Sequence, residues 1–109
     1  MNLRKADDFI ADIERQYEWY LDHASTDIAE RYLIAVETTC ALLGSHPLIG
    51  TALQATHPRL SAWRFLAAFR PFQRHIVFYE MAGPDLILRR VMHGHRDLPR
   101  RLLDPPGAE

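Results

Sequence analysis

The segment from Gln73 to Leu98 constrains the fold most, because it reads as two apolar runs around a turn. The runs cover residues 74–81 and 86–93, and Gly83-Pro84-Asp85 lies between them. Two such runs flanking a Gly- and Pro-containing turn predict a β-hairpin. Neither face of either predicted strand is purely polar, so we expect each face to meet protein surface, at least in part.

The second predicted strand ends in a basic, imidazole-rich stretch that contains His93, His95, Arg96 and Asp97. His93 is compatible either with a hydrogen-bonded structural position in the sheet or with a functional role. The same two interpretations apply to His95. Arg96-Asp97 is interpreted as an internal ion pair or a helix cap. Arg90 interrupts an apolar strand, where an unpaired buried charge is costly. It must therefore pair or reach solvent, and Glu80 on the neighbouring strand is the candidate partner.

Two helices are predicted in the first half of the chain. Ile10, Ile13, Tyr17 and Leu21 recur at helical spacing after Asp7-Asp8, whose carboxylates can cap a helix. The neighbouring Tyr17-x-Trp19-Tyr20 cluster is interpreted as packing between the two helices rather than as a surface for stacking bases.

The second predicted helix starts at Asp27, which forms a capping-box pattern with Glu30. Gly44 and Pro47 end it. The link between the helices is short, which favours an antiparallel pair.

The expected fold is α+β with element order β-α-α-β-β-β. A short strand opens the chain, residues 45–60 form a loop, residues 61–69 form a strand, and residues 97–103 form a last helical turn. We expect one domain over residues 1–103 and a flexible tail over 104–109. The helix pair should cover one face of a mainly antiparallel sheet and leave the other for function or a partner.

Charge is distributed unevenly along the 109 residues. Residues 1–56 hold four basic and nine acidic residues, a difference of −5, and residues 57–109 hold nine and five, a difference of +4, which gives the net charge of −1. The overall balance argues against broad nucleic-acid binding. The basic half favours contact with an anionic partner.

Cysteine usage and the N-terminus indicate a soluble, cytoplasmic protein. Cys40 is the sole cysteine, which excludes a disulfide framework and a cysteine zinc cluster. We find no signal-peptide pattern and no apolar stretch near the ~18 residues of a membrane helix. His93-x-His95 has no third ligand at suitable spacing, so we expect no metal and no cofactor.

Taken in order, these motifs resemble the ParE/RelE superfamily of toxins from type II toxin-antitoxin systems, and the ParE branch more closely. The resemblance covers residues 2–103. It is carried by four stretches, namely the first strand with its acidic helix start, Leu42-Leu43-x-x-x-Pro47-x-x-Gly50, His75-Ile76-Val77-Phe78-Tyr79, and Arg90-Val91-x-His93-x-x-Arg96-Asp97.

The resemblance implies a small cytoplasmic toxin of the plasmid-stabilisation type that forms a hetero-oligomer with a ParD-like antitoxin. The C-terminal segment of such an antitoxin wraps the toxin, and its N-terminal part binds operator DNA. ParE-like toxins inhibit DNA gyrase by protein–protein contact. RelE-like toxins cleave mRNA on the ribosome.

The ParE-like interpretation needs an interaction surface and no catalytic set. The residues expected to contact the target are Arg89, Arg90, His93, His95 and Arg96. The residues expected to contact the antitoxin are Ile13, Tyr17, Tyr20, Tyr32 and Val36.

Two alternatives remain. One is a RelE-like endoribonuclease, in which Arg64, Arg90, His93, His95 and Arg96 would act on the RNA phosphate. Against it, no tyrosine follows Arg96, the only lysine is Lys5, and the chain is acidic overall. The other alternative is a degenerate toxin that only binds its antitoxin.

Overall fold

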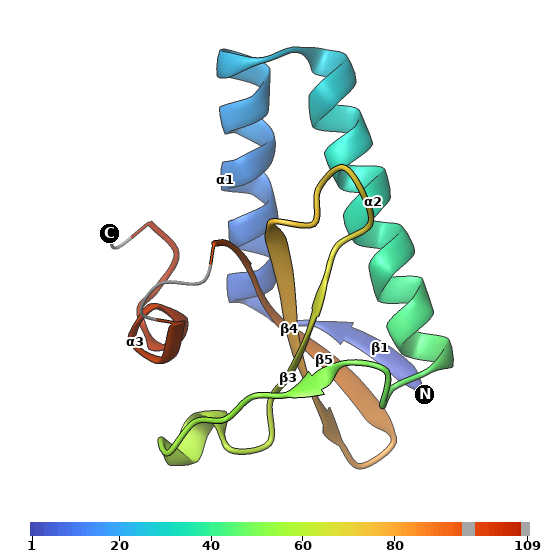
Figure 1. The fold of residues 1–109 in the computed structure, drawn as a ribbon, viewed down its shortest axis with the longest axis vertical. Coiled ribbons are helices and arrows are strands. Elements are labelled where there is room, and N and C mark those ends of the chain that lie inside the picture. Colours follow the sequence, from blue (N-terminus) through green and yellow to red (C-terminus); the bar gives the residue numbers. More distant parts are fainter. Residues whose placement is uncertain (95–97, 108–109) are drawn as a thin grey trace.

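The structure, a computed structural model, describes residues 1–94 and 98–107. Figure 1 shows a helix pair beside a twisted sheet. In chain order the elements are β1 (Asn2–Lys5), α1 (Asp7–His23), α2 (Thr26–Ser45), β2 (Thr51–Ala52), a 3₁₀ turn (Pro58–Leu60), β3 (Arg64–Ala67), β4 (His75–Ala82), β5 (Asp85–His93) and α3 (Leu98–Leu103).

The described strands form one five-stranded sheet in the order β1-β5-β4-β3-β2. β1 lies parallel to β5, and the other pairs are antiparallel. This arrangement confirms the predicted α+β class and the mainly antiparallel sheet. Two elements were not predicted, because β2 and the 3₁₀ turn both fall in the stretch interpreted as a loop.

The predicted hairpin is β4 and β5, joined at Gly83, whose φ of +60° suits glycine. The strands pair from His75↔His93 to Ala82↔Asp85, with a bulge where Phe78 pairs with Arg90 but Tyr79 pairs with Leu88. A bulge inserts one extra residue and shifts the alternation of faces.

Simple alternation along β5 would place Leu88 and Arg90 on one face of the sheet and Val91 on the other. The bulge makes that expectation wrong. Leu88 and Val91 both enter the helix-side core, and Arg90 lies opposite Phe78.

The helix starts differ in detail from the predicted caps. Asp7 and Asp8 lie within the first turn of α1, where their negative charges interact favourably with the positive end of the helix dipole. Ala6 precedes the helix and provides no side-chain cap. For α2 the cap is Ser25, whose Oγ accepts a hydrogen bond from the Ile28 amide at 3.1 Å. The cap predicted at Asp27 therefore lies two residues too late.

Each face of the sheet supports a separate hydrophobic core. The helix-side core includes Phe9, Tyr32, Val36, Cys40, Leu43, Val77, Tyr79, Leu86, Leu88 and Val91. The core on the opposite face consists of Leu60, Trp63, Ile76, Phe78, Met92 and Leu102. The face expected to be left for a partner is thus covered by the 3₁₀ turn and α3 of the same chain, because its alternate strand residues are themselves large and apolar.

A cluster of hydrogen bonds fixes the loop after α2. The Tyr79 hydroxyl donates to the Pro47 carbonyl at 2.6 Å and accepts from the Gly50 amide at 3.0 Å. Arg64 Nη2 donates to the carbonyls of Leu48 and Gly50 at 3.2 and 2.7 Å. A Cβ on Gly50 would collide with the Tyr79 hydroxyl, so glycine is required there. These bonds account for the Pro47-x-x-Gly50 motif.

Candidate interaction surfaces

Arg90 is a buried structural residue in this fold, with 3% of its surface exposed. Its Nε and Nη2 donate to the two carboxylate oxygens of Asp12 at 2.7 and 3.0 Å. Its Nη1 donates to the carbonyls of Arg101, Leu102 and Asp104 at 3.3, 3.2 and 2.6 Å. The partner suggested by the sequence, Glu80, is wrong, because Arg90 pairs with Asp12 and Glu80 pairs with the neighbouring Arg89.

These contacts form what we call the Arg90 clamp, which ties α1, β5 and α3 together. Asp12 Oδ2 also accepts the Val91 amide at 3.0 Å, beyond the last β1–β5 pair at Leu88. Burial raises the pKa of Asp12, and the hydrogen bond and charge of Arg90 oppose that rise. The clamp therefore keeps Arg90 away from any macromolecular partner in this conformation.

The other predicted target-contact residues lie closer to solvent. Arg89 pairs with Glu80 at 2.7 Å, and 35% of its side chain is exposed. His93 is exposed at the end of β5. His95 and Arg96 lie outside the described residues.

His93 belongs to a cluster of rings that reaches into the protein. Its ring packs edge-on against His75, with centroids 4.9 Å apart. His75 is buried, and its Nε2 is hydrogen-bonded to the Tyr20 hydroxyl at 2.8 Å. Burial lowers the pKa of His75 to about 4, with a smaller contribution from the charge of His93, so His75 is neutral near pH 7.

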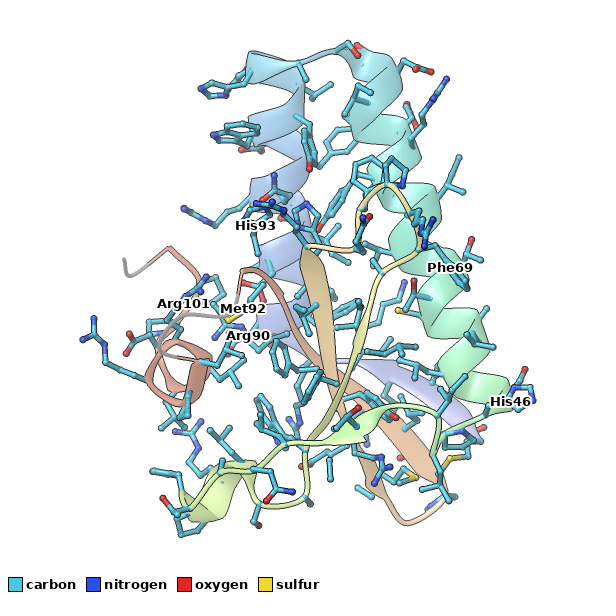
Figure 2. All side chains as sticks on the ribbon, viewed as in Figure 1. His46, Phe69, Arg90, Met92, His93 and Arg101 are labelled. Carbon is cyan, nitrogen blue, oxygen red and sulfur yellow. The ribbon has the colours of Figure 1, made fainter. Side chains whose placement is uncertain are left out.

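A cleft opens beside His93, between α1 and α3, and we call it the α1–α3 cleft (Figure 2). It comprises two adjoining hollows of about 150 and 190 Å³, both lined by Gln16, Trp19 and His93. The first hollow is also lined by Arg15 and Arg101. Trp19 is 51% exposed, which corrects the interpretation of its ring as helix packing.

The signal for this cleft was partly present in the sequence. Trp19 falls off the apolar stripe of α1, whereas Ile13 and Tyr17 lie on it, and such an aromatic faces solvent. Arg15 and Arg101 were missed because nothing local brings α3 against α1. Their proximity depends on the Arg90 clamp.

Of the five residues expected to contact an antitoxin, Tyr32 and Val36 are fully buried in the helix-side core. That expectation is wrong for both, because the apolar stripe of α2 faces the sheet. Ile13, Tyr17 and Tyr20 are partly exposed on α1.

The outer side of α2 instead carries a separate apolar depression of about 260 Å³, which we call the α2 groove. Ile34 on α2 is 66% exposed and Phe69 on the β3–β4 loop is 45% exposed, and both line the groove. Arg31 and Arg70 also line it. Exposed apolar side chains gathered in one depression are typical of protein-binding sites.

The nuclease alternative loses two of its five residues in this structure. Arg64 is committed to the loop after α2, and Arg90 is buried in its clamp. Among the described residues, no three side chains of the metal-binding types come together to hold an ion.

Comparison with known proteins identifies the class to which this fold and these surfaces belong. The sequence matches the family model for the ParE toxin of the type II toxin-antitoxin system, parDE, over residues 3–98. The chain belongs to this family, as the sequence motifs had indicated. A search of curated proteins gives no match.

A solved chain described as a chromosomal ParDE system from P. aeruginosa has the same fold, with a TM-score of 0.71. The match covers 87% of this chain and 97% of that one at 16% identity. Within the described residues, none of the helices has the length and apolar character needed to cross a bilayer.

Proposed function

We propose that this ParE-family chain is an active cytoplasmic toxin that inhibits DNA gyrase by protein–protein contact and is neutralised by a ParD-like antitoxin. Family membership over residues 3–98 carries the proposal. Two separate exposed surfaces support it, since a toxin that is held by one partner and acts on another needs a contact region for each.

The antitoxin is assigned to the α2 groove. Its apolar lining, with Ile34 and Phe69 exposed, suits an apolar segment of the antitoxin laid along α2. Arg70 at the groove favours an acidic residue in that segment, whereas Arg31 already pairs with Asp27 at 2.9 Å. Operator DNA is then contacted through the antitoxin and not by this chain.

Gyrase is assigned to the solvent-facing part of β5 that carries Arg89 and His93. A protein-contact mechanism is preferred to RNA cleavage because Arg64 and Arg90 already donate hydrogen bonds to backbone carbonyls of the fold. A nuclease needs cations that are able to meet the developing phosphorane charge.

The test is a supercoiling assay with purified gyrase, relaxed plasmid and purified toxin, with and without the antitoxin encoded beside it. We expect inhibition by micromolar toxin and relief of that inhibition by equimolar antitoxin. No inhibition, together with ribosome-dependent cleavage of mRNA by the same preparation, would reverse the assignment. A chain that causes no growth arrest when expressed alone would favour the degenerate toxin.

A further inference from the structure

We propose that Thr39 is a positioning residue for antitoxin binding, because its hydroxyl holds the β3–β4 loop (residues 68–74) against α2 and so fixes the shape of the α2 groove. The inference rests on the proposed function, which places an apolar segment of the antitoxin in this groove. It adds a residue that acts from behind the contact, since Thr39 is fully buried and does not line the groove itself.

The two walls of the α2 groove come from segments that are distant in the sequence. Ile34, Ala35 and Thr38 of α2 line one wall, and residues 69–72 of the loop line the other. Figure 2 shows Phe69 beside α2. The pairing of β3 with β4 ends at Ala67, before these loop residues begin. The width of the groove therefore depends on the contacts that join the loop to α2.

Thr39 joins the two walls through a single hydroxyl, and we call this contact the Thr39 latch. Its Oγ1 donates to the Ala35 carbonyl, one turn earlier in α2, at 2.7 Å. The same oxygen accepts a hydrogen bond from the Phe69 amide at 3.2 Å. A hydroxyl carries one hydrogen and two lone pairs, so the bond to Ala35 uses the donor and leaves the acceptor for the loop.

The remaining contacts of the loop make it a preformed wall. The Phe72 amide donates to the Phe69 carbonyl at 2.9 Å and closes a turn over the two residues between them. Phe72 is 5% exposed, and its ring packs edge-on against Tyr32 of α2 with centroids 5.8 Å apart. The turn is thus attached to α2 on both sides, by Tyr32 at Phe72 and by Thr39 at Phe69. Between these attachments the Phe69 side chain remains partly exposed at the groove.

A wall that is fixed in advance lowers the cost of binding, because the antitoxin does not have to order it. Without the hydroxyl of Thr39, the Phe69 amide would face α2 without an acceptor, and loop positions away from α2 would gain population. The apparent affinity of a site falls with the fraction of molecules in which the site is formed. We therefore expect loss of the Thr39 latch to weaken antitoxin binding about fivefold. The action on the target should not change, since it is assigned to another surface.

The experiment removes the hydroxyls of two neighbouring threonines in the full-length chain. Thr39→Val replaces the hydroxyl by a methyl group, and Thr39→Ser and Thr39→Ala differ from each other only in the hydroxyl. Thr38→Val is the matched control, because the Thr38 hydroxyl also donates to a carbonyl one turn earlier, that of Ile34, at 2.7 Å. Within the part of the chain that the structure describes, Thr38 makes no hydrogen bond to the loop. The affinity for the purified antitoxin encoded beside the chain is measured by calorimetry, together with hydrogen exchange of the Phe69 amide in free toxin and growth arrest without antitoxin.

We expect Thr39→Val and Thr39→Ala to bind the antitoxin about fivefold more weakly than wild type and to exchange the Phe69 amide faster. Thr39→Ser and Thr38→Val should stay within about twofold of wild type in affinity, and all four variants should still arrest growth. If Thr39→Val does not fold, the serine and alanine variants decide, because alanine is readily accommodated in a helix. Equal affinities of Thr39→Ser and Thr39→Ala, or an equal loss in Thr38→Val, would overturn the inference.

Ile34→Asp separates failure of this inference from failure of the proposed function, because Ile34 lines the groove itself. If Ile34→Asp weakens antitoxin binding and the Thr39 variants do not, the Thr39 latch is wrong and the assignment of the antitoxin to the α2 groove stands. If Ile34→Asp leaves the affinity unchanged, or if the wild-type chain binds no antitoxin, the assignment to the groove fails and the inference fails with it.

Discussion

The replacement Asp12→Asn should be among the most destabilising changes of a single polar side chain in this protein. The carboxylate accepts two hydrogen bonds from the Arg90 guanidinium and one from the Val91 amide. Both side chains are buried, at 3% and 7% exposure for Arg90 and Asp12. Asparagine keeps the shape but leaves the Arg90 charge without a counter-charge.

The expected cost is about 3–5 kcal/mol, the range for breaking a buried ion pair from one side. A domain of this size has a total stability on the order of 5–15 kcal/mol, so the variant would lose a large part of it. Removing both partners in Asp12→Leu/Arg90→Met should cost less than the sum of the single changes, because no uncompensated charge remains.

Urea denaturation followed by tryptophan fluorescence measures these differences. Glu80→Gln is the matched control, since the Arg89–Glu80 pair lies one residue along β5 but is 35% and 17% exposed. Its loss should cost about 1 kcal/mol or less. A cost for Asp12→Asn no larger than that of the control would refute the role assigned to the Arg90 clamp.

Three further predictions concern other parts of the molecule. Because the pKa of His75 falls from 6.5 to about 4 on folding, the unfolded chain binds a proton at a higher pH than the folded chain does. The free energy of unfolding should therefore drop by up to ~3 kcal/mol between pH 6.5 and pH 4. Urea titrations at several pH values should show this drop, and a flat profile would contradict it. Tyr79→Phe should lower the free energy of unfolding by about 1–3 kcal/mol, since it leaves the Gly50 amide and the Pro47 carbonyl without their partner. A decrease below about 0.5 kcal/mol in the same urea titration would contradict this role for the Tyr79 hydroxyl. Ile34→Asp should weaken antitoxin binding about tenfold or more in calorimetry without reducing toxicity, whereas Ile10→Asp, on the other helix at 41% exposure, should leave affinity unchanged; equal effects of the two would argue against the α2 groove.

The sequence was most informative where structure follows from local periodicity. The β4–β5 hairpin and the α1–α2 pair were predictable because apolar spacing and turn residues act over a few positions. The bulge opposite Phe78 was not, since it adds a single residue to one strand without interrupting the apolar pattern. With that extra residue Arg90 pairs with Phe78 in the sheet register, and its side chain is buried against Asp12.

The interaction surfaces were harder to predict because they join segments that are distant in the sequence. Trp19 and Arg101 line one cleft only once α3 is in place, and α3 is held partly through carbonyl groups that carry no sequence signal. Tyr32 and Val36 illustrate the opposite difficulty. A helical apolar stripe predicts a buried face, but it does not say whether the face is buried within the chain or against a partner.

Plasmid topology in cells gives the most direct test of the mode of action proposed for this toxin. A reporter plasmid and total mRNA are recovered from the same culture at intervals after the chain is expressed without antitoxin. We predict that negative supercoiling of the plasmid is lost as growth stops, while mRNA remains intact. Fragmented mRNA in cells whose plasmid keeps its normal superhelical density would contradict the account.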